Sequence, residues 1–236
     1  MTPNELKYNM VTIAERLSCA YDRVIKAEQN SPFSDTVQLL AVSKTKPIEL
    51  IEDAYDAGQR QFGESYVQEA VDKIQQLKDK KDIEWHFIGP IQSNKSRHIA
   101  EHFSWVQSVD RLKIAKRLNE QRPNNLMPLN ILIQVNISED ENKSGCQLSE
   151  LDELASFIAD ARQLNLRGLM TITEKTDDEQ KQLQYFQQMR ACFDKLKHQY
   201  PQVDTLSMGM SQDLEPAITA GANMVRIGTD IFGKRQ

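Results

Sequence analysis

Short apolar runs of β-forming residues alternate with longer helical patterns along most of this 236-residue chain. That alternation is typical of βα units, whose strands form a parallel sheet. The sequence predicts eight strands, at residues 38–42, 61–63, 83–88, 105–109, 130–137, 166–172, 204–208 and 224–227. Eight strands with eight βα connections predict a single (β/α)8 barrel over residues 1–236, a usual length for that fold. An open doubly wound sheet is the alternative, because counting strands does not prove closure.

An amphipathic segment precedes the first predicted strand. Its apolar residues recur at helical spacing and predict one helix within residues 1–30, packed on the outside of the domain. These residues are Leu6, Met10, Ile13, Leu17, Tyr21 and Val24.

Residue types at the ends of the other helical patterns predict where those helices begin. Pro47 suits the first turn of a helix, where its missing N–H is harmless. Asp110 and Ser149 are expected to cap two further helices. The longest helix is expected over residues 177–199, ended by Pro201.

Composition and charge exclude several classes of protein. No apolar stretch approaches the roughly 18 residues of a membrane span, and the N-terminus lacks the pattern of a secretory signal, so we expect a cytoplasmic protein. The net charge of -5 argues against nucleic acid or an anionic membrane as partner. The three cysteines suggest no disulfide framework. His98 and His102 are four residues apart, but Ile99 stands where a zinc HExxH motif has Glu, so no metal is expected.

Small, polar and basic residues follow the predicted strands. Ligands bind at the carboxyl ends of the strands in either candidate fold, so these loops are the expected site. The loops after the seventh and eighth strands, SMGMS (207–211) and RIGT (226–229), suit a phosphate, because glycines let backbone N–H groups approach an anion. Each loop alone is also a common turn. The other loops contribute Lys44, Ser65, Lys95, Asn136 and Lys143.

Two cations stand out at these strand ends. Lys44 follows the apolar strand directly, where burial would lower its pKa and let the neutral amine attack an aldehyde. Lys46 is the competing candidate, and a solvated lysine is the plain alternative. Arg226 lies inside the last strand and requires a partner, because its charge cannot be shed. That partner is either a glutamate, such as Glu64 or Glu84, or a ligand.

Seven segments together resemble the pyridoxal phosphate homeostasis protein family. They are AVSKTKP (41–47), FGESYVQE (62–69), WHFIGPIQSNK (85–95), KSG (143–145), LRGLM (166–170), LSMGMS (206–211) and MVRIGTDIFG (224–233). Their order and spacing agree with the family from about Leu39 to the C-terminus. The resemblance implies an alanine-racemase-type barrel without the racemase's additional β-domain.

The resemblance also implies the roles of individual residues. Lys44 would carry pyridoxal 5'-phosphate (PLP) as a Schiff base, and Arg226 would face the pyridine nitrogen. Ser65 stands where the family commonly has Asn; its single hydroxyl is shorter than an amide and leaves room for water. Asn136 is a further expected cofactor contact. The phosphate would be held by Ser207, Gly228 and Thr229, with Gly209 and Ser211 nearby.

These roles predict a carrier of PLP without established catalysis. A cationic Arg226 would oppose protonation of the ring, which weakens PLP as an electron sink. The racemase's second base comes from the additional domain, which this chain is expected to lack. The alternatives are a weak amino-acid racemase and a cofactor-free Schiff-base aldolase. Apoenzymes are possible recipients of PLP, a monomer is expected, and Lys95 or Lys143 could assist transfer.

Overall fold

Eight parallel strands form a closed barrel in the computed structural model, which describes residues 11–33, 35–140, 143–174, 176 and 178–234. The strands follow one another around the barrel in sequence order, and β1 closes the ring by pairing with β8. The predicted barrel is therefore confirmed, and the open sheet is wrong. The strands are β1 (Gln38–Val42), β2 (Gln61–Glu64), β3 (Glu84–Phe87), β4 (Trp105–Val109), β5 (Leu129–Gln134), β6 (Leu164–Met170), β7 (Thr205–Met210) and β8 (Met224–Ile227).

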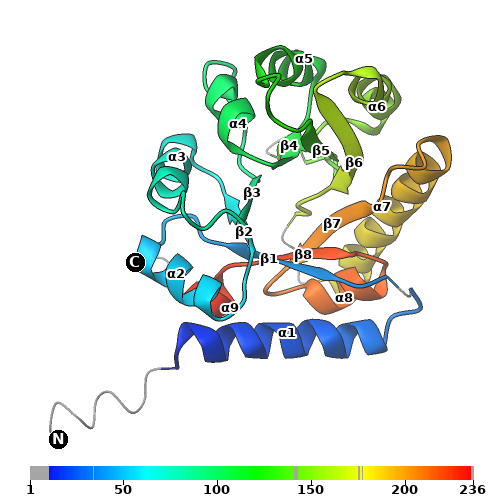
Figure 1. Cartoon of the computed structure of the whole chain (residues 1–236). Helices are drawn as coiled ribbons and strands as arrows, with labels where there is room; N and C mark the ends of the chain where they lie inside the picture. The colour runs from blue at the N-terminus through cyan, green and yellow to red at the C-terminus, as the bar shows by residue number, and fades with distance from the viewer. Residues whose placement is uncertain (1–10, 34, 141–142, 175, 177, 235–236) are drawn as a thin grey trace, which may run out of the picture.

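Helices surround the barrel and cover its outer surface (Figure 1). Their buried apolar side chains pack against the outward-facing residues of the strands in one large core. None of the described helices is long and apolar enough to cross a membrane. The helices are α1 (Ile13–Gln29), α2 (Ile48–Asp56), α3 (Val67–Gln76), α4 (Ser96–His102), α5 (Leu112–Gln121), the 3-10 helix η2 (Leu148–Glu150), α6 (Leu151–Asp160), α7 (Glu179–Gln199), α8 (Leu214–Thr219) and α9 (Thr229–Phe232).

Helix α1 lies across the outside of the ring, against α8, α9 and α2 (Figure 1). It begins at Ile13, because Thr12 and Glu15 form a reciprocal capping box there. The predicted positions Leu6 and Met10 lie outside the described residues. Arg23 connects α1 to the site end of the barrel, because its guanidinium donates to Glu215, Asp230 and the backbone carbonyl of Ser211.

Three predicted helix starts are wrong. Pro47 is the extended N-cap of α2 and not a residue of its first turn. Asp110 does not cap α5, because its carboxylate accepts from Arg111, which is itself the N-cap. Ser149 lies inside η2, where Gln147 and Glu150 form the cap.

The longest predicted helix begins two residues later than expected. Helix α7 starts at Glu179, because the Asp178 side chain accepts from the N–H groups of Gln180 and Lys181. The predicted first residue, Asp177, lies outside the described residues. The predicted strands are all present, with ends that differ from the prediction by up to three residues.

Candidate functional site

A cavity of about 860 Å³ opens at the carboxyl ends of the strands. Volumes of a few hundred to a thousand Å³ are usual for small-molecule sites. Val42 of β1 and Met210 of β7 end their strands in its wall. Five of the predicted site residues line it: Lys44, Ser211, Arg226, Gly228 and Thr229. The loops predicted to form a site therefore meet around one space.

Lys44 and Lys46 have different surroundings, although only one residue separates them. Lys44 is half-buried and lines the cavity. The amine of Lys46 donates to the backbone carbonyls of Gly233 and Lys234, at 2.9 and 2.8 Å. Of the two candidates, the geometry favours Lys44 as the lysine that meets a ligand.

Arg226 is almost fully buried and also reaches the cavity. Its NH1 donates to the Ser207 hydroxyl at 2.7 Å, and its NH2 donates to the Thr171 carbonyl at 2.8 Å. Burial lowers the pKa of Arg226 to about 10, which the Asp213 carboxylate opposes. The two neutral partners position the charge without cancelling it.

The glutamates proposed as partners of Arg226 lie elsewhere. Glu64 forms an ion pair with Lys73 at 2.8 Å, and Glu84 lies 4.0 Å from His86. The prediction of an ion pair between Arg226 and either glutamate is therefore wrong. The other prediction, that a ligand meets this charge, stays open.

A chain of buried hydrogen bonds runs from Arg226 across the interior of the barrel. The Ser207 hydroxyl donates to Oε1 of Gln107 at 2.7 Å. Nε2 of Gln107 lies 2.9 Å from Nδ1 of His86, so a neutral imidazole accepts this bond. The chain therefore has one direction, from guanidinium to hydroxyl to amide to imidazole.

Burial disfavours the charged form of His86 at the far end of this chain. Its side chain is fully buried and stacks on Trp105, with ring centroids 5.1 Å apart. Burial lowers the pKa of His86, and the nearby Glu84 carboxylate opposes that shift only in part. Nε2 has no hydrogen-bond partner among the described residues.

Ser207 and Gly209 lie in β7 and do not line the cavity. The hydroxyl of Ser207 is already bonded to both Gln107 and Arg226. Gly209 has φ +93°, and a side chain there would meet Cβ of Ala217 at 2.6 Å. These contacts favour a supporting role for both residues, and their direct contact with a phosphate stays a prediction.

Gly228 brings the last strand close to the first. A Cβ at this position would lie 3.2 Å from the carbonyl oxygen of Val42, tighter than nine in ten ordinary Cβ contacts. Its backbone therefore packs beside the loop that carries Lys44. Thr229 follows it as the first residue of α9 and shares the same wall of the cavity.

Ser65 and Asn136 lie outside the lining of this cavity. The Ser65 backbone packs on Gly89, where a side chain would meet the Ser65 carbonyl oxygen at 2.2 Å. The buried Asn136 amide donates to the Asp140 carbonyl within its own loop. Cofactor contacts from these two residues stay predictions.

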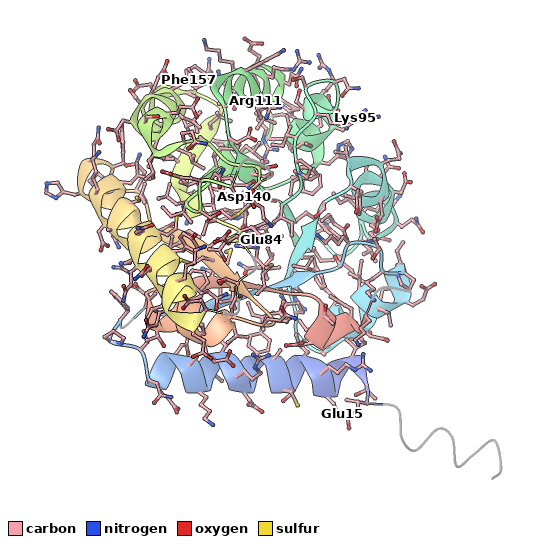
Figure 2. All side chains as sticks on the ribbon, turned by 180° about the vertical axis from the view of Figure 1, so that it is seen from behind. Glu15, Glu84, Lys95, Arg111, Asp140 and Phe157 are labelled. Carbon is pink, nitrogen blue, oxygen red and sulfur yellow. The ribbon has the colours of Figure 1, made fainter. Side chains whose placement is uncertain are left out.

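Lys143 and Lys95 occupy different places. Lys143 lines a second space of about 190 Å³. Ile88 and Ile172 line both this space and the larger cavity, so the two are neighbours. Lys95 is the N-cap of α4, at the outer edge of the molecule (Figure 2). The geometry associates only Lys143 with the site.

Four carboxylates in the cavity wall were not predicted. They are Glu174, Glu179, Asp213 and Asp230. Burial raises the pKa of Asp213, whose two oxygens accept from the Met210 N–H and the Gln182 amide. Asp230 lies within the segment 224–233, whereas the other three carboxylates lie in none of the seven segments. Glu174 belongs to the loop before α7, Glu179 to α7, and Asp213 is the N-cap of α8.

The histidine pair of α4 lies close to a carboxylate. Ligand atoms of His98, Glu101 and His102 are within 4.8 Å of one another on this partly exposed helix. Nδ1 of His102 already contacts the His98 carbonyl at 2.9 Å, and Glu101 lies 3.8 Å from Arg97. These contacts are internal to α4, and the expectation of no metal stays a prediction.

Comparisons with known proteins agree on one family. The family model described as alanine racemase, N-terminal domain, matches residues 22–236. A pyridoxal phosphate homeostasis protein of Escherichia coli (strain K12) is 52% identical over 234 residues, which cover 98% of this chain and 97% of that protein. The namesake of Pseudomonas aeruginosa is 52% identical over 227 residues, covering 96% and 97%.

Solved structures give the same picture. PipY of Synechococcus elongatus, solved with PLP bound, is 36% identical with a TM-score of 0.80, over 94% of this chain and all of that one. Alanine racemase from Corynebacterium glutamicum, at 18% identity and a TM-score of 0.67, shares the fold over 94% of this chain and 60% of its own.

Proposed function

This chain belongs to the pyridoxal phosphate homeostasis protein family and binds PLP, and we propose that it holds the cofactor between Lys44 and Arg226 and acts as a carrier. The observation that carries the proposal is that both side chains line one cavity at the carboxyl end of the barrel. They come from opposite ends of the sequence, and the pairing of β1 with β8 brings them together.

The residues around this cavity fit PLP. The cofactor has an aldehyde, a phosphate and a pyridine ring, and the site offers an amine, glycine-rich backbone and a buried cation. Gly228 supports the fit, because its missing side chain lets the backbone of the last loop lie beside Val42 and the Lys44 loop. Ser211 and Thr229 are the hydroxyl residues in the same wall.

Each residue has a distinct proposed task. When bound, PLP supplies an aldehyde that combines with amines and a ring that withdraws electrons. Lys44 would hold it covalently through Nζ, with the aldehyde oxygen leaving as water, and Ser211, Gly228 and Thr229 would bind the phosphate. Ser207 and Thr171 orient Arg226 toward the ring nitrogen.

The charge of Arg226 supports a carrier without catalysis. A cation beside the ring nitrogen would disfavour its protonation, so the bound ring would withdraw electrons poorly. The neutral hydrogen-bond partners of Arg226 leave that charge in place. We therefore expect no measurable racemisation of amino acids by the PLP-loaded protein. The proposal keeps the predicted monomer and the predicted transfer of PLP to apoenzymes.

The first experiment is a visible absorption spectrum of the purified, PLP-loaded protein before and after borohydride reduction. We expect a yellow protein whose reduced adduct maps to Lys44 by mass spectrometry. Lys44→Ala should lose the adduct, and the matched control Lys46→Ala should retain it, because the Lys46 amine is bonded to the C-terminal backbone. An adduct on Lys46 would contradict the proposal. So would a protein that stays colourless after PLP is added to it.

A further inference from the structure

The loop that carries Lys44 is held from both sides by a cluster of charged residues on neighbouring elements. This cluster consists of Glu64 at the end of β2 and of Glu69 and Lys73 on α3. Lys73 donates to Glu64 at 2.8 Å and to Glu69 at 2.5 Å. The Lys73 side chain is only 6% exposed and that of Glu64 is fully buried. A lysine is almost never buried unless its charge is paired, and removing one partner of a buried ion pair leaves an uncompensated charge.

The cluster contacts the residue before Lys44 through two hydrogen bonds. Lys73 Nζ donates to the carbonyl of Ser43 at 2.8 Å, and the Ser43 hydroxyl donates to Oε1 of Glu64 at 2.6 Å. Ser43 itself is fully buried. The backbone that enters Lys44 is therefore fixed by a side chain of α3 and a side chain of β2.

The cluster also contacts the residue after Lys44. The N–H of Thr45 donates to Oε1 of Glu69 at 2.6 Å. Thr45 has φ +63°, in the left-handed region that β-branched residues strongly avoid. The N–H of Lys46 donates to the Ser43 carbonyl at 3.1 Å, which makes residues 43–46 a turn with Thr45 at its third position. Turns with positive φ at that position ordinarily carry Gly or Asn there.

We infer that Lys73 and Glu69 are positioning residues for Lys44, which keep its loop in a strained turn that aims its amine into the cavity. The inference rests on the proposed function, because it concerns how Lys44 is presented to PLP. Strained backbone persists only where surrounding contacts hold it, and such strain gathers at functional sites. Here the contacts come from the cluster, on both sides of the reactive lysine.

Titration of PLP into the apo-protein, followed by visible absorbance, tests the inference. Lys73→Met keeps most of the side-chain volume and removes the charge. We expect its Kd for PLP to rise by about tenfold or more, because binding must then order the loop. Arg122→Met is the matched control, since Arg122 is a buried cation that donates to the carbonyls of Ala100, Phe103 and Met127, away from the cavity. It should lower the Tm and leave the Kd unchanged.

A second pair of variants separates positioning from stability and stays informative if Lys73→Met does not fold. Glu69 is part-exposed, and Glu69→Ala removes the acceptor for the Thr45 N–H. We expect its Kd to rise by about three- to tenfold, on the same ordering argument. Adding Thr45→Gly should restore much of the lost affinity, because glycine adopts positive φ without strain. Because relief of strain at Thr45 also stabilises the fold, the Tm of each variant is measured beside its Kd, and Arg122→Met shows what a loss of stability alone does to the Kd.

Two results would overturn the inference. One is a wild-type Kd in both Lys73→Met and Glu69→Ala, and the other is a loss in Glu69→Ala that Thr45→Gly does not repair. Failure of the proposed function looks different, because the wild-type protein itself would then yield no borohydride adduct on Lys44.

Discussion

At the scale of single residues, Ser207 decides how Arg226 is held. Its hydroxyl accepts from the guanidinium and donates to Gln107, so it uses both of its hydrogen-bonding functions inside the barrel. A buried charged donor that loses its partner bears the full cost of desolvation. The hydroxyl of Ser207 therefore stabilises the fold and the orientation of the cation together.

Replacing Ser207 by alanine separates these two effects. We expect Ser207→Ala to lower the free energy of unfolding by about 1–3 kcal/mol and to weaken PLP binding several-fold. Ser96→Ala is the matched control, because the buried Ser96 hydroxyl also accepts from an arginine, Arg117, and donates to a glutamine, Gln121, but at α4. Denaturant unfolding and PLP titration measure both quantities. Equal losses of affinity in the two variants would contradict a positioning role for Ser207.

At the scale of elements, the approach of β6 to β7 depends on a missing side chain. Gly168 has φ +151°, and a Cβ there would lie 1.8 Å from the carbonyl oxygen of Thr205. The register of β5 with β6 shifts just before this glycine, between Ile131 and Leu132. A side chain at Gly168 would force β6 and β7 apart, on the side of the barrel that supplies Thr171 and Ser207.

A pair of glycine variants tests this packing. We expect Gly168→Ala to lower the free energy of unfolding by about 3 kcal/mol or more, because backbone atoms in a close-packed sheet cannot yield. Gly58→Ala serves as control, since Gly58 also has positive φ, +101°, but no atom of the described residues lies within 4 Å of a new Cβ there. That variant should lose only about 1 kcal/mol from backbone strain. Similar losses by denaturant unfolding in both variants would show that packing at Gly168 is unimportant.

The elements also show which features a sequence can predict. The strands were predictable because both of their faces are buried and their residues form short apolar runs. The helix starts were not, because residue type alone does not reveal which neighbour a side chain will bind. Asp110 is of a residue type that often caps helices, yet its carboxylate accepts a hydrogen bond from Arg111.

At the scale of the whole molecule, the free energy of unfolding at acid pH depends on His86, which ends the polar chain inside the barrel. Burial lowers the pKa of this imidazole in the folded protein. When the pH falls below the unfolded value of about 6.5, the unfolded chain binds a proton that the folded protein refuses, so stability is lost. Above that pH the histidine is neutral in both states and its contribution is fully present.

Comparison of the wild type with His86→Gln isolates this contribution. The wild type should lose up to about 1.4 kcal/mol of unfolding free energy per pH unit below pH 6.5 relative to the variant. Glutamine can still accept from Gln107 and does not titrate. His198→Gln, at an exposed position of α7, should keep the acid dependence of the wild type. Denaturant unfolding between pH 4 and 8 measures the free energy of unfolding of both proteins. Parallel curves of this free energy against pH for wild type and His86→Gln would contradict the expectation.

The site was predictable only in part, because some of its residues are far apart in the sequence. Lys44 and Arg226 could be predicted because each stands out within its own strand and motif. The residues that hold them could not, since Gln107 and Ser207 are 100 positions apart and meet only when the barrel closes. Two signals were nonetheless present in the sequence. Gln107 interrupts the run WVQSV, and Lys73 occupies the apolar face of α3 between the buried Ala70 and Leu77.

Ring closure by the first and last strands also has a consequence for biosynthesis. Lys44 follows β1 and Arg226 lies in β8, so the two cations proposed to hold the cofactor are translated near the beginning and near the end of the chain. A ribosome-bound intermediate carries the lysine long before the arginine and its loop have emerged. If these two residues hold the cofactor as proposed, a nascent chain has the lysine without a site around it, and cofactor capture waits until the last strand has been made.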